Sequence, residues 1–447
     1  MTNSDNPAPF GEPNNAPHRV VILIAGITLL ASLGSVYAWS FFSKILQATY
    51  HWSNMQTSLV FSLAVAGLGF SALYTGPYVS KLGGRHLMKR ATKFFVAGNF
   101  IAALGLYLGG GVLGPVETPW INHLSFGLLA LGYGAIGGIG LGTGYVTAVS
   151  TVSGWFPDKK GLATGLIVMG FGLGALFMSK VFAPLAMSLT GGDVALSFLF
   201  LGIFFAIIMT IACQYIYSPH AAVKSKAKPT VGESMEYGQS VRVRLWLICF
   251  LYSVAGLGII SLLSPLMQSM MSAADPAMDK VALAAAGATL IAIASIGNSL
   301  GRLLWAGLSD YIGRVNVFLA LLSTAACAYL VLPYVSSPFL FGLLICFAIS
   351  TYGGGFGTIP SLISDLYGVK RMSAMHGLVL TGWATAGLIS PTFFGILYDR
   401  LPAAQATQIA YGICAAVLVV ATVIVASLRS AHQRAVTPVE EAALAST

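Results

Sequence analysis

One arginine stands out because it lies inside an apolar stretch. Arg302 has apolar neighbours on both sides, in a run long enough to cross a membrane. A charged side chain at membrane depth is costly unless it faces a wet cavity or a partner, and arginine stays protonated in proteins. No Asp or Glu falls inside the apolar runs of the sequence. Because a guanidinium matches a carboxylate with parallel hydrogen bonds, we expect Arg302 to bind a carboxylate ligand; a structural ion pair is the alternative.

Polar and aromatic residues at helical spacing are further candidates. Asn298 lies four residues before Arg302 and would share its helix face, where it could bind the guanidinium, the ligand or a neighbouring helix. Tyr352 and Phe356 are also four residues apart. The three glycines between them predict a loosened helix, which often marks a binding site in membrane proteins. Ordinary core packing is the alternative for both aromatic residues.

A histidine near a span interior is the candidate for proton coupling. His376 lies seven residues before Trp383, on roughly the same helix face, and histidine can change charge near neutral pH. A histidine at the membrane interface is the alternative. The sequence shows no metal-ligand spacing, nucleophile motif or paired carboxylates, so we expect neither an enzyme nor a cofactor or metal. The glycine run at 138–144 lies inside an apolar stretch with no strand before it, which argues against a nucleotide loop.

Composition identifies the elements that must position these residues. The chain has 447 residues, of which 56% are hydrophobic and only 8% charged, whereas soluble domains carry about 25% charged residues. A membrane-spanning helix needs about 20 apolar residues. The sequence therefore predicts an all-α membrane protein with twelve transmembrane helices, at 20–43, 55–79, 94–115, 122–151, 162–187, 194–217, 244–270, 281–309, 315–335, 338–363, 373–398 and 404–429.

The basic residues predict the orientation. The formal charge is +9, but the lysines and arginines form short clusters between apolar runs, as the positive-inside rule expects, and no basic stripe suggests nucleic acid. We expect a multi-pass protein of the cell (inner) membrane with both termini cytoplasmic. The predicted parts are a disordered N-terminus (1–19), two six-helix halves (20–217 and 244–429), a cytoplasmic linker (218–243) and a cytoplasmic tail (430–447).

Weak internal symmetry supports two related halves. A glycine-bearing basic turn at 76–85 follows the second span, and a similar turn at 307–314 follows the eighth. These turns resemble the signature of the major facilitator superfamily, which implies two six-helix halves around a central cavity. In that family the turn helps to hold the cytoplasmic gate. The second turn keeps Asp310, but Ser80 stands where the family has Asp, which removes the acid that a charge latch in the first half needs.

Three further segments, 34–40, 155–163 and 301–314, resemble the oxalate/formate antiporter family and its monocarboxylate-transporting relatives. The resemblance runs through most of the chain and omits the tails and the linker. It implies that Arg302 holds the substrate carboxylate. It also implies that an aromatic cavity surrounds the substrate, with Phe171 where the oxalate carrier has tyrosine. The implied lining residues are Tyr37, Tyr145, Phe171, Tyr352 and Phe356.

The departures from these relatives define the expected substrate. Trp383 stands where the oxalate antiporter has a lysine, and Val65 where it has glutamine. Asn298 replaces the aspartate of mammalian monocarboxylate transporters. One remaining cation suits one negative charge, so we expect alternating-access transport of a small monocarboxylate such as lactate, pyruvate or formate. Oxalate/formate exchange and a non-transporting carboxylate sensor are the alternatives.

The absence of Asp and Glu from the predicted spans favours anion exchange over proton symport. The partners expected are the substrate and membrane lipid, and the twelve-span plan can work as a monomer.

Overall fold

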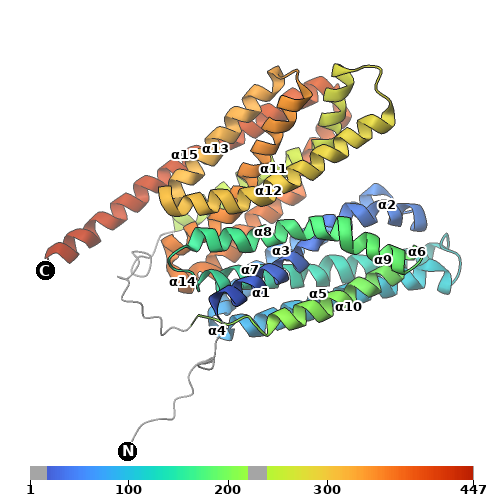
Figure 1. Ribbon diagram of the computed structural model, residues 1–447, viewed down its shortest axis with the longest axis horizontal. Helices are drawn as coiled ribbons and strands as arrows, with labels where there is room; N and C mark the ends of the chain where they lie inside the picture. The colour runs from blue at the N-terminus through green and yellow to red at the C-terminus, as the bar shows by residue number, and fades with distance from the viewer. Residues whose placement is uncertain (1–17, 220–238, 446–447) are drawn as a thin grey trace, which may run out of the picture.

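The computed structural model describes residues 18–219 and 239–445, which are helical almost throughout. The helices of the first half run from α1 to α10 in chain order (Figure 1). Short turns of 3-10 or π helix continue several of them, as at Ser35–Ala38 (η1) between α1 and α2. The bounds are α1 (Arg19–Gly34), α2 (Trp39–Tyr50), α3 (Asn54–Thr75), α4 (Val79–Leu82), α5 (Gly84–Tyr107), α6 (Pro119–Leu129), α7 (Gly137–Ser153), α8 (Lys160–Phe177), α9 (Ala183–Leu189) and α10 (Val194–Cys213).

The second half contains fewer and longer helices. One of them, α14, is 63 residues long, about three times the length of a span. It breaks at Gly368, whose φ of 72° favours glycine because a Cβ would be strained there. The bounds of these helices are α11 (Gln239–Ala274), α12 (Lys280–Ile312), α13 (Arg314–Val331), α14 (Pro338–Arg400) and α15 (Ala403–Ala445).

The expected number of crossings is confirmed. Within the described ranges, eleven helices are long and apolar enough to span a membrane. The one at Pro338–Tyr398 has 61 residues and contains the break at Gly368, so it accounts for two crossings. The total is therefore twelve. The predictions for residues 1–17 and 220–238, which include most of the linker, concern segments outside the described residues.

Two local expectations are wrong. The glycines at 353–355 do not loosen α14, which stays helical through them. They instead let neighbouring helices approach, since a Cβ on Gly353 would lie 2.1 Å from the Asn298 carbonyl oxygen. In addition, α5 begins at Gly84 and not at 94. The basic residues of this segment extend the helix beyond its apolar part, because they have good helix propensity and need no lipid.

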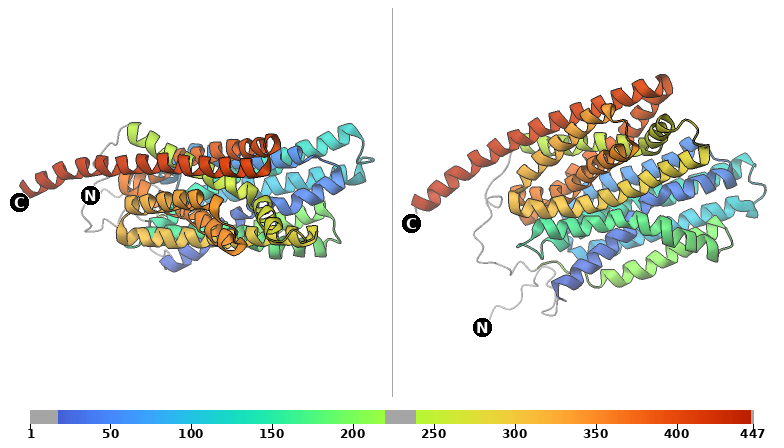
Figure 2. Two further views of the ribbon diagram at one scale, coloured as in Figure 1. Left: turned by 90° about the horizontal axis from the view of Figure 1, so that it is seen from above. Right: turned by 45° about the horizontal axis from the view of Figure 1, so that its top comes forward.

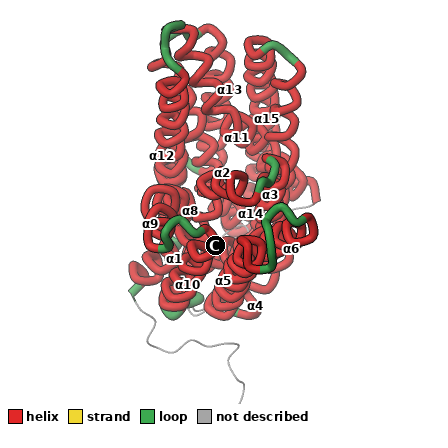
Figure 3. Tube along the Cα trace, turned by 90° about the vertical axis from the view of Figure 1, so that its right-hand side faces the viewer, coloured by secondary structure: helices red, strands yellow, loops and turns green. Residues whose placement is uncertain are grey.

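The helices form two bundles that lie side by side along the long axis of the molecule (Figure 2). Seen end on, the helices of the first half form one bundle and α11, α12, α13 and α15 form the other (Figure 3). Helix α1 begins and α15 ends at the same end of the molecule (Figure 1). Helices α5, α8, α11 and α13 begin at this end too, and near their starts stand Arg85, Lys160, Arg242 and Arg314, so we call it the basic end.

Two seams join the halves, and glycine makes both of them tight. In the first seam α8 packs on α12, where a Cβ on Gly165 would lie 2.6 Å from the Arg302 carbonyl oxygen. In the second seam α3 packs on the part of α14 after Gly368, where a Cβ on Gly377 would lie 2.2 Å from the Ala72 carbonyl oxygen. Small residues let helix backbones approach in this way. Both seams therefore place backbone against backbone across the two halves.

Candidate substrate site

Arg302 lies in the first seam, where α12 faces α8. It is 3% exposed, and its Nη1 donates a hydrogen bond to the carbonyl oxygen of Val168 at 3.0 Å. Its guanidinium carbon stands 5.6 Å from the centre of the Phe356 ring, a favourable cation–π arrangement. Its Nε has no hydrogen-bond partner among the described residues, and no acid there forms an ion pair with it. The buried guanidinium therefore keeps unused donor capacity.

A small cavity opens beside this guanidinium. Its volume is about 10 Å³, which is room for about one water molecule. The two halves line it together, because four residues come from each. Six of the sequence candidates are brought together here. The lining residues are Tyr37, Leu68, Tyr145, Phe171, Arg302, Phe356, Leu380 and Trp383.

Aromatic rings form most of the cavity wall. Tyr37, in η1 between α1 and α2, meets Phe171 edge-on with ring centres 5.3 Å apart. Tyr145 on α7 meets the same Phe171 ring at 5.2 Å. Across the halves, the ring centres of Tyr37 and Trp383 are 6.5 Å apart. Within the second half, those of Phe356 and Trp383 are 6.0 Å apart. These edge-to-face contacts give the cavity a defined shape.

Tyr352 stands one layer behind this wall. Its hydroxyl accepts a hydrogen bond from Trp383 Nε1 at 3.1 Å, so it orients the indole and does not line the cavity. Tyr252 on α11 packs against both Tyr352 and Phe356, at 5.9 and 5.5 Å between ring centres. Sequence reasoning missed Tyr252, Leu68 and Leu380. An aromatic or leucine in an apolar run carries no signal that separates a cavity wall from an ordinary core.

Asn298 does not join Arg302 at the cavity. It lies against Gly353 on α14, and its side-chain oxygen is buried with no partner among the described residues. Spacing of four residues puts two side chains on one side of a helix, but the neighbouring helices decide what each side chain meets. Here the Asn298 side chain packs against Gly353 of α14 and is not among the residues that line the cavity.

His376 lies behind Tyr145. The imidazole is fully buried, and its ring centre is 5.7 Å from that of Tyr145. Neither ring nitrogen has a hydrogen-bond partner among the described residues. The side chain therefore lies inside the bundle and not on its surface, and it is not among the residues that line the cavity.

A charge network closes the first seam at the basic end. Helix α8 begins at Lys160, and Lys159 before it has no side-chain oxygen to cap the helix. Asp310 of α12 supplies the missing acceptor, since its two carboxylate oxygens accept from the Gly161 and Leu162 amides, each at 2.9 Å. An acid at a helix N-terminus is favourable because it meets free N–H groups and the positive end of the helix dipole. The cap therefore joins the two halves.

Arg314 and Asp365 extend this network. Arg314 pairs with Asp310 at 2.6 Å and with Asp365 at 3.2 Å. Lys160 of the first half reaches Asp365 at 3.7 Å. The side chains of Asp310 and Arg314 are only 14% and 12% exposed, so water screens their attraction weakly. Charges of both signs thus hold α8 against the second half.

Among the described residues, the corresponding turn of the first half forms no such network. Arg85 turns toward its own half, where it donates to the carbonyl oxygens of Gln214 and Ile216 and stands 4.0 Å from the centre of the Tyr217 ring. Ser80 is exposed and forms no ion pair. The second seam is therefore joined by packing at this end, as at Gly76, where a Cβ would meet the Ser373 carbonyl oxygen at 2.3 Å.

Known proteins resemble this chain in sequence. The family model of the Major Facilitator Superfamily matches residues 24–291 and 280–446. The uncharacterized MFS-type transporter YhjX of Escherichia coli is 27% identical over 382 residues, which cover 83% of this chain and 86% of that protein. The oxalate:formate antiporter of Oxalobacter formigenes is 24% identical over 380 residues, 83% of each chain. Apicoplast pyruvate carrier 1 of Toxoplasma gondii is 28% identical over 185 residues, 36% of this chain and 34% of the carrier.

Solved structures share the fold. A bacterial homologue of the iron transporter ferroportin in an outward-facing state has a TM-score of 0.69 at 12% identity, over 92% of this chain and 99% of that one. The Escherichia coli fucose:proton symporter has a TM-score of 0.62 at 17% identity, over 90% and 98%. The twelve crossings, the two joined halves and the match along almost the whole chain agree. The protein belongs to the Major Facilitator Superfamily and is a membrane transporter.

Proposed function

We propose that the protein carries a small monocarboxylate anion of the lactate, pyruvate or formate class, and that Arg302 binds its carboxylate. The carrying observation is a buried guanidinium, 3% exposed, with no acid partner in the described part of the chain and a cavity beside it. A charge so placed is costly unless something compensates it. Val168 offers one neutral carbonyl, whereas a carboxylate offers two acceptor oxygens and the opposite charge.

The number of charges at the cavity supports a monoanion. Arg302 is the only ionised side chain among the lining residues, all of which are described. A dianion would bring a second negative charge, with no cation to pair with it, into a cavity of mostly aromatic wall, which costs several kcal/mol. The wall of Phe171, Phe356 and Trp383 suits a short apolar substituent such as a methyl group. Two relatives are named for oxalate, formate or pyruvate, which agrees with a small carboxylate.

Transport requires that the halves move apart on each side in turn. With room for about one water molecule, the cavity admits a substrate only when a seam opens. We assign the basic end to the cytoplasm of a cell (inner) membrane, because lysine and arginine collect on that side. The Asp310 network then closes the cytoplasmic side. Opening it would release substrate inward as the halves rock about Arg302.

Coupling by exchange fits this arrangement. In the empty carrier the described partners of Arg302 are neutral, namely the Val168 carbonyl, the Phe356 ring and the Tyr37 hydroxyl, so crossing without an anion is less favourable than crossing with one. No lining residue is an acid that could carry a proton with the substrate. His376 is the remaining route for proton symport. We therefore propose anion exchange as the main mode.

The test is uptake of labelled lactate or pyruvate into proteoliposomes. Arg302→Ala should abolish saturable uptake while folded protein remains in the membrane. Arg302→Lys should restore little of the uptake, because the lysine ammonium lacks the planar guanidinium that binds both oxygens of a carboxylate. Arg90→Ala, at an exposed arginine of α5, is the matched control and should transport normally. Normal uptake by Arg302→Ala would refute the assignment. Substrate binding without uptake in the wild type would instead support the alternative of a carboxylate sensor.

A further inference from the structure

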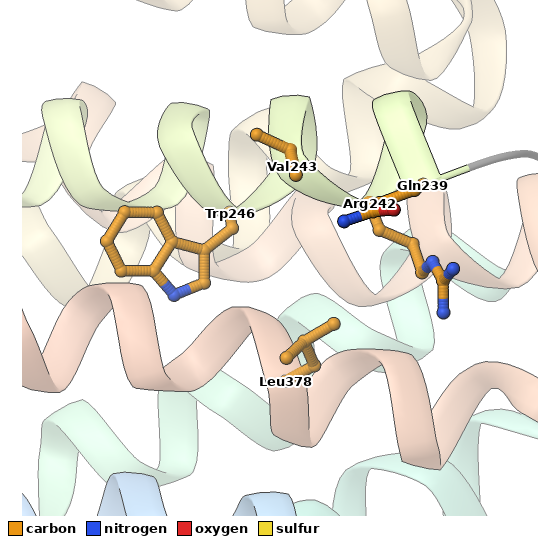
Figure 4. A pocket seen from close by; sticks show the side chains of 5 residues that line it. All are labelled: Gln239, Arg242, Val243, Trp246 and Leu378. Atoms are coloured by element: carbon orange, nitrogen blue, oxygen red, sulfur yellow. The ribbon is translucent and has the colours of Figure 1, made fainter.

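A second cavity lies at the basic end, away from Arg302. Its volume is about 460 Å³, and it lies between the start of α11 and the part of α14 after Gly368. Four of its five lining residues come from α11 (Figure 4). They are Gln239, Arg242, Val243 and Trp246, with Leu378 from α14. We call this cavity the α11 groove.

Two neighbouring arginines of α11 have different surroundings. Arg244 is partly buried and donates to the Ser427 carbonyl oxygen of α15 at 3.2 Å. Arg242 is exposed and forms no hydrogen bond or ion pair with the described residues. Its guanidinium extends from α11 toward α14 beside the groove (Figure 4). Arg244 is thus held by its bond to α15, whereas Arg242 places at the groove a cation that pairs with none of the described residues.

The other side of the groove is a fixed apolar wall. The Trp246 indole donates its Nε1 hydrogen to Thr381 Oγ1 at 2.9 Å and stacks on Phe250 with ring centres 5.3 Å apart. Its only polar atom is therefore satisfied, and its ring presents carbon to the groove next to Leu378 (Figure 4). A ligand that fits must carry a negative charge at one end and hydrocarbon at the other.

We propose that the α11 groove binds one anionic phospholipid of the cytoplasmic leaflet. The groove lies at the charged end of membrane-spanning helices, where lipid headgroups are found, and basic pockets between such helices bind anionic headgroups. Arg242 and the Gln239 amide donate to the phosphate, and the upper acyl chain lies along Trp246 and Leu378. The apolar wall favours a lipid over a soluble anion. Because Thr381 is close in sequence to Leu380 and Trp383 of the substrate cavity, the lipid would also steady that part of α14.

Native mass spectrometry of the purified full chain, titrated with phosphatidylglycerol or phosphatidylcholine, tests this proposal. The wild type should retain one phosphatidylglycerol in preference to phosphatidylcholine. Arg242→Gln should lose about fivefold in that preference, which corresponds to the ~1 kcal/mol that one basic residue contributes near a membrane surface. Arg90→Gln removes an equally exposed cation from α5 and should leave the preference unchanged.

Several results would overturn the proposal. An equal loss in both variants would mean that general surface charge attracts the lipid. An unchanged preference in Arg242→Gln would place the lipid elsewhere. Displacement of the lipid by millimolar glycerol 3-phosphate would assign the groove to a soluble phosphate. If the wild type retains neither lipid, something other than lipid fills the groove. None of these measurements depends on the transported substrate, so the proposed function can stand or fall separately.

Discussion

The two seams between the halves use the same backbone packing but different chemistry. The first seam, α8 against α12, contains Arg302 at the cavity and the Asp310 network at the basic end. The second seam, α3 against α14, contains neutral residues at the corresponding levels, Trp383 at the cavity and Ser80 at the turn. Attraction between charges is strong where little water screens it, and it depends on which charges face each other. The hydrophobic effect that drives apolar packing is not directional. We infer that the first seam both recognises the anion and controls the cytoplasmic gate, while the second shapes the cavity.

The largest effect on the difference between the seams is expected from removing the carboxylate of Asp310, which caps α8 and pairs with Arg314. Asp310→Asn leaves the α8 amides with a weaker acceptor and Arg314 with one acid fewer. Charged hydrogen bonds contribute ~1.5–3 kcal/mol, so opening at the basic end should become roughly tenfold more frequent. Thr164→Cys is a suitable reporter, because Thr164 is buried in the interface against Ser361. The rate of maleimide labelling of this cysteine should rise by the same factor in Asp310→Asn. Exposed Cys327 is replaced by Ser in this experiment, so that it does not react.

Asp158→Asn is the matched control for Asp310→Asn, because it removes an acid outside the Asp310 network. Asp158 pairs with Arg19 at 3.2 Å, but both side chains are about half exposed, and such surface pairs contribute little. Asp158→Asn, added to the Thr164→Cys reporter, should leave the rate of maleimide labelling unchanged. Equal rates for Asp310→Asn and Asp158→Asn would show that the network does not hold the gate.

A cation placed in the second seam should change substrate preference. The wild type should prefer lactate or pyruvate to oxalate in a competition assay, because one cation matches one negative charge. Trp383→Lys supplies a second cation at the cavity wall, and the relative affinity for oxalate should rise about fivefold, a change of ~1 kcal/mol. Trp383→Phe controls for the lost indole and its bond to Tyr352. If oxalate competes best in the wild type, the monocarboxylate proposal is wrong and oxalate/formate exchange replaces it.

An acid placed at the Ser80 turn (76–85) should make the seams more alike. Ser80→Asp puts a carboxylate near the start of the α14 segment after Gly368, since the same turn already packs on Ser373. An exposed acid near a helix N-terminus contributes ~0.3–1 kcal/mol, so labelling of Thr164→Cys should slow about twofold to threefold. Combined with Asp310→Asn, it should restore part of the lost closure. A labelling rate that Ser80→Asp leaves unchanged would mean that the Ser80 turn does not act on the gate.

The smallest effect is expected at His376. Exchange measured by counterflow should change less than twofold in His376→Ala, because the imidazole lies behind Tyr145 and does not line the cavity. An imposed pH gradient alone should drive little accumulation in the wild type. Strong gradient-driven uptake that disappears in His376→Ala, with counterflow intact, would replace exchange by proton coupling through this histidine. His376→Gln would separate loss of the ring's chemistry from loss of its volume.

The fold could be predicted well because its signal is repeated along the chain. Each span is a run of about 20 apolar residues, and a charge such as Arg302 inside one of them is conspicuous in the sequence. The boundaries were weaker where helices continue into the polar region, as at Gly84, because a basic helix has no apolar pattern to mark its end. The glycines before Phe356 misled the prediction, since glycine can break a helix or let another helix approach, and only the neighbour decides.

The number of crossings, the two related halves and the buried cation follow from the sequence alone, because each depends on residue type and local spacing. The missing acid at Ser80 follows from the resemblance to the family signature. Only the tertiary structure decided which residues meet. It put Asn298 against α14 and outside the cavity lining, placed Tyr352 behind Trp383, and gave Asp310 the amides of α8, more than a hundred residues away in the chain. A helix face is a local property, but its partner is set by how glycine, side-chain volume and charge let distant helices pack.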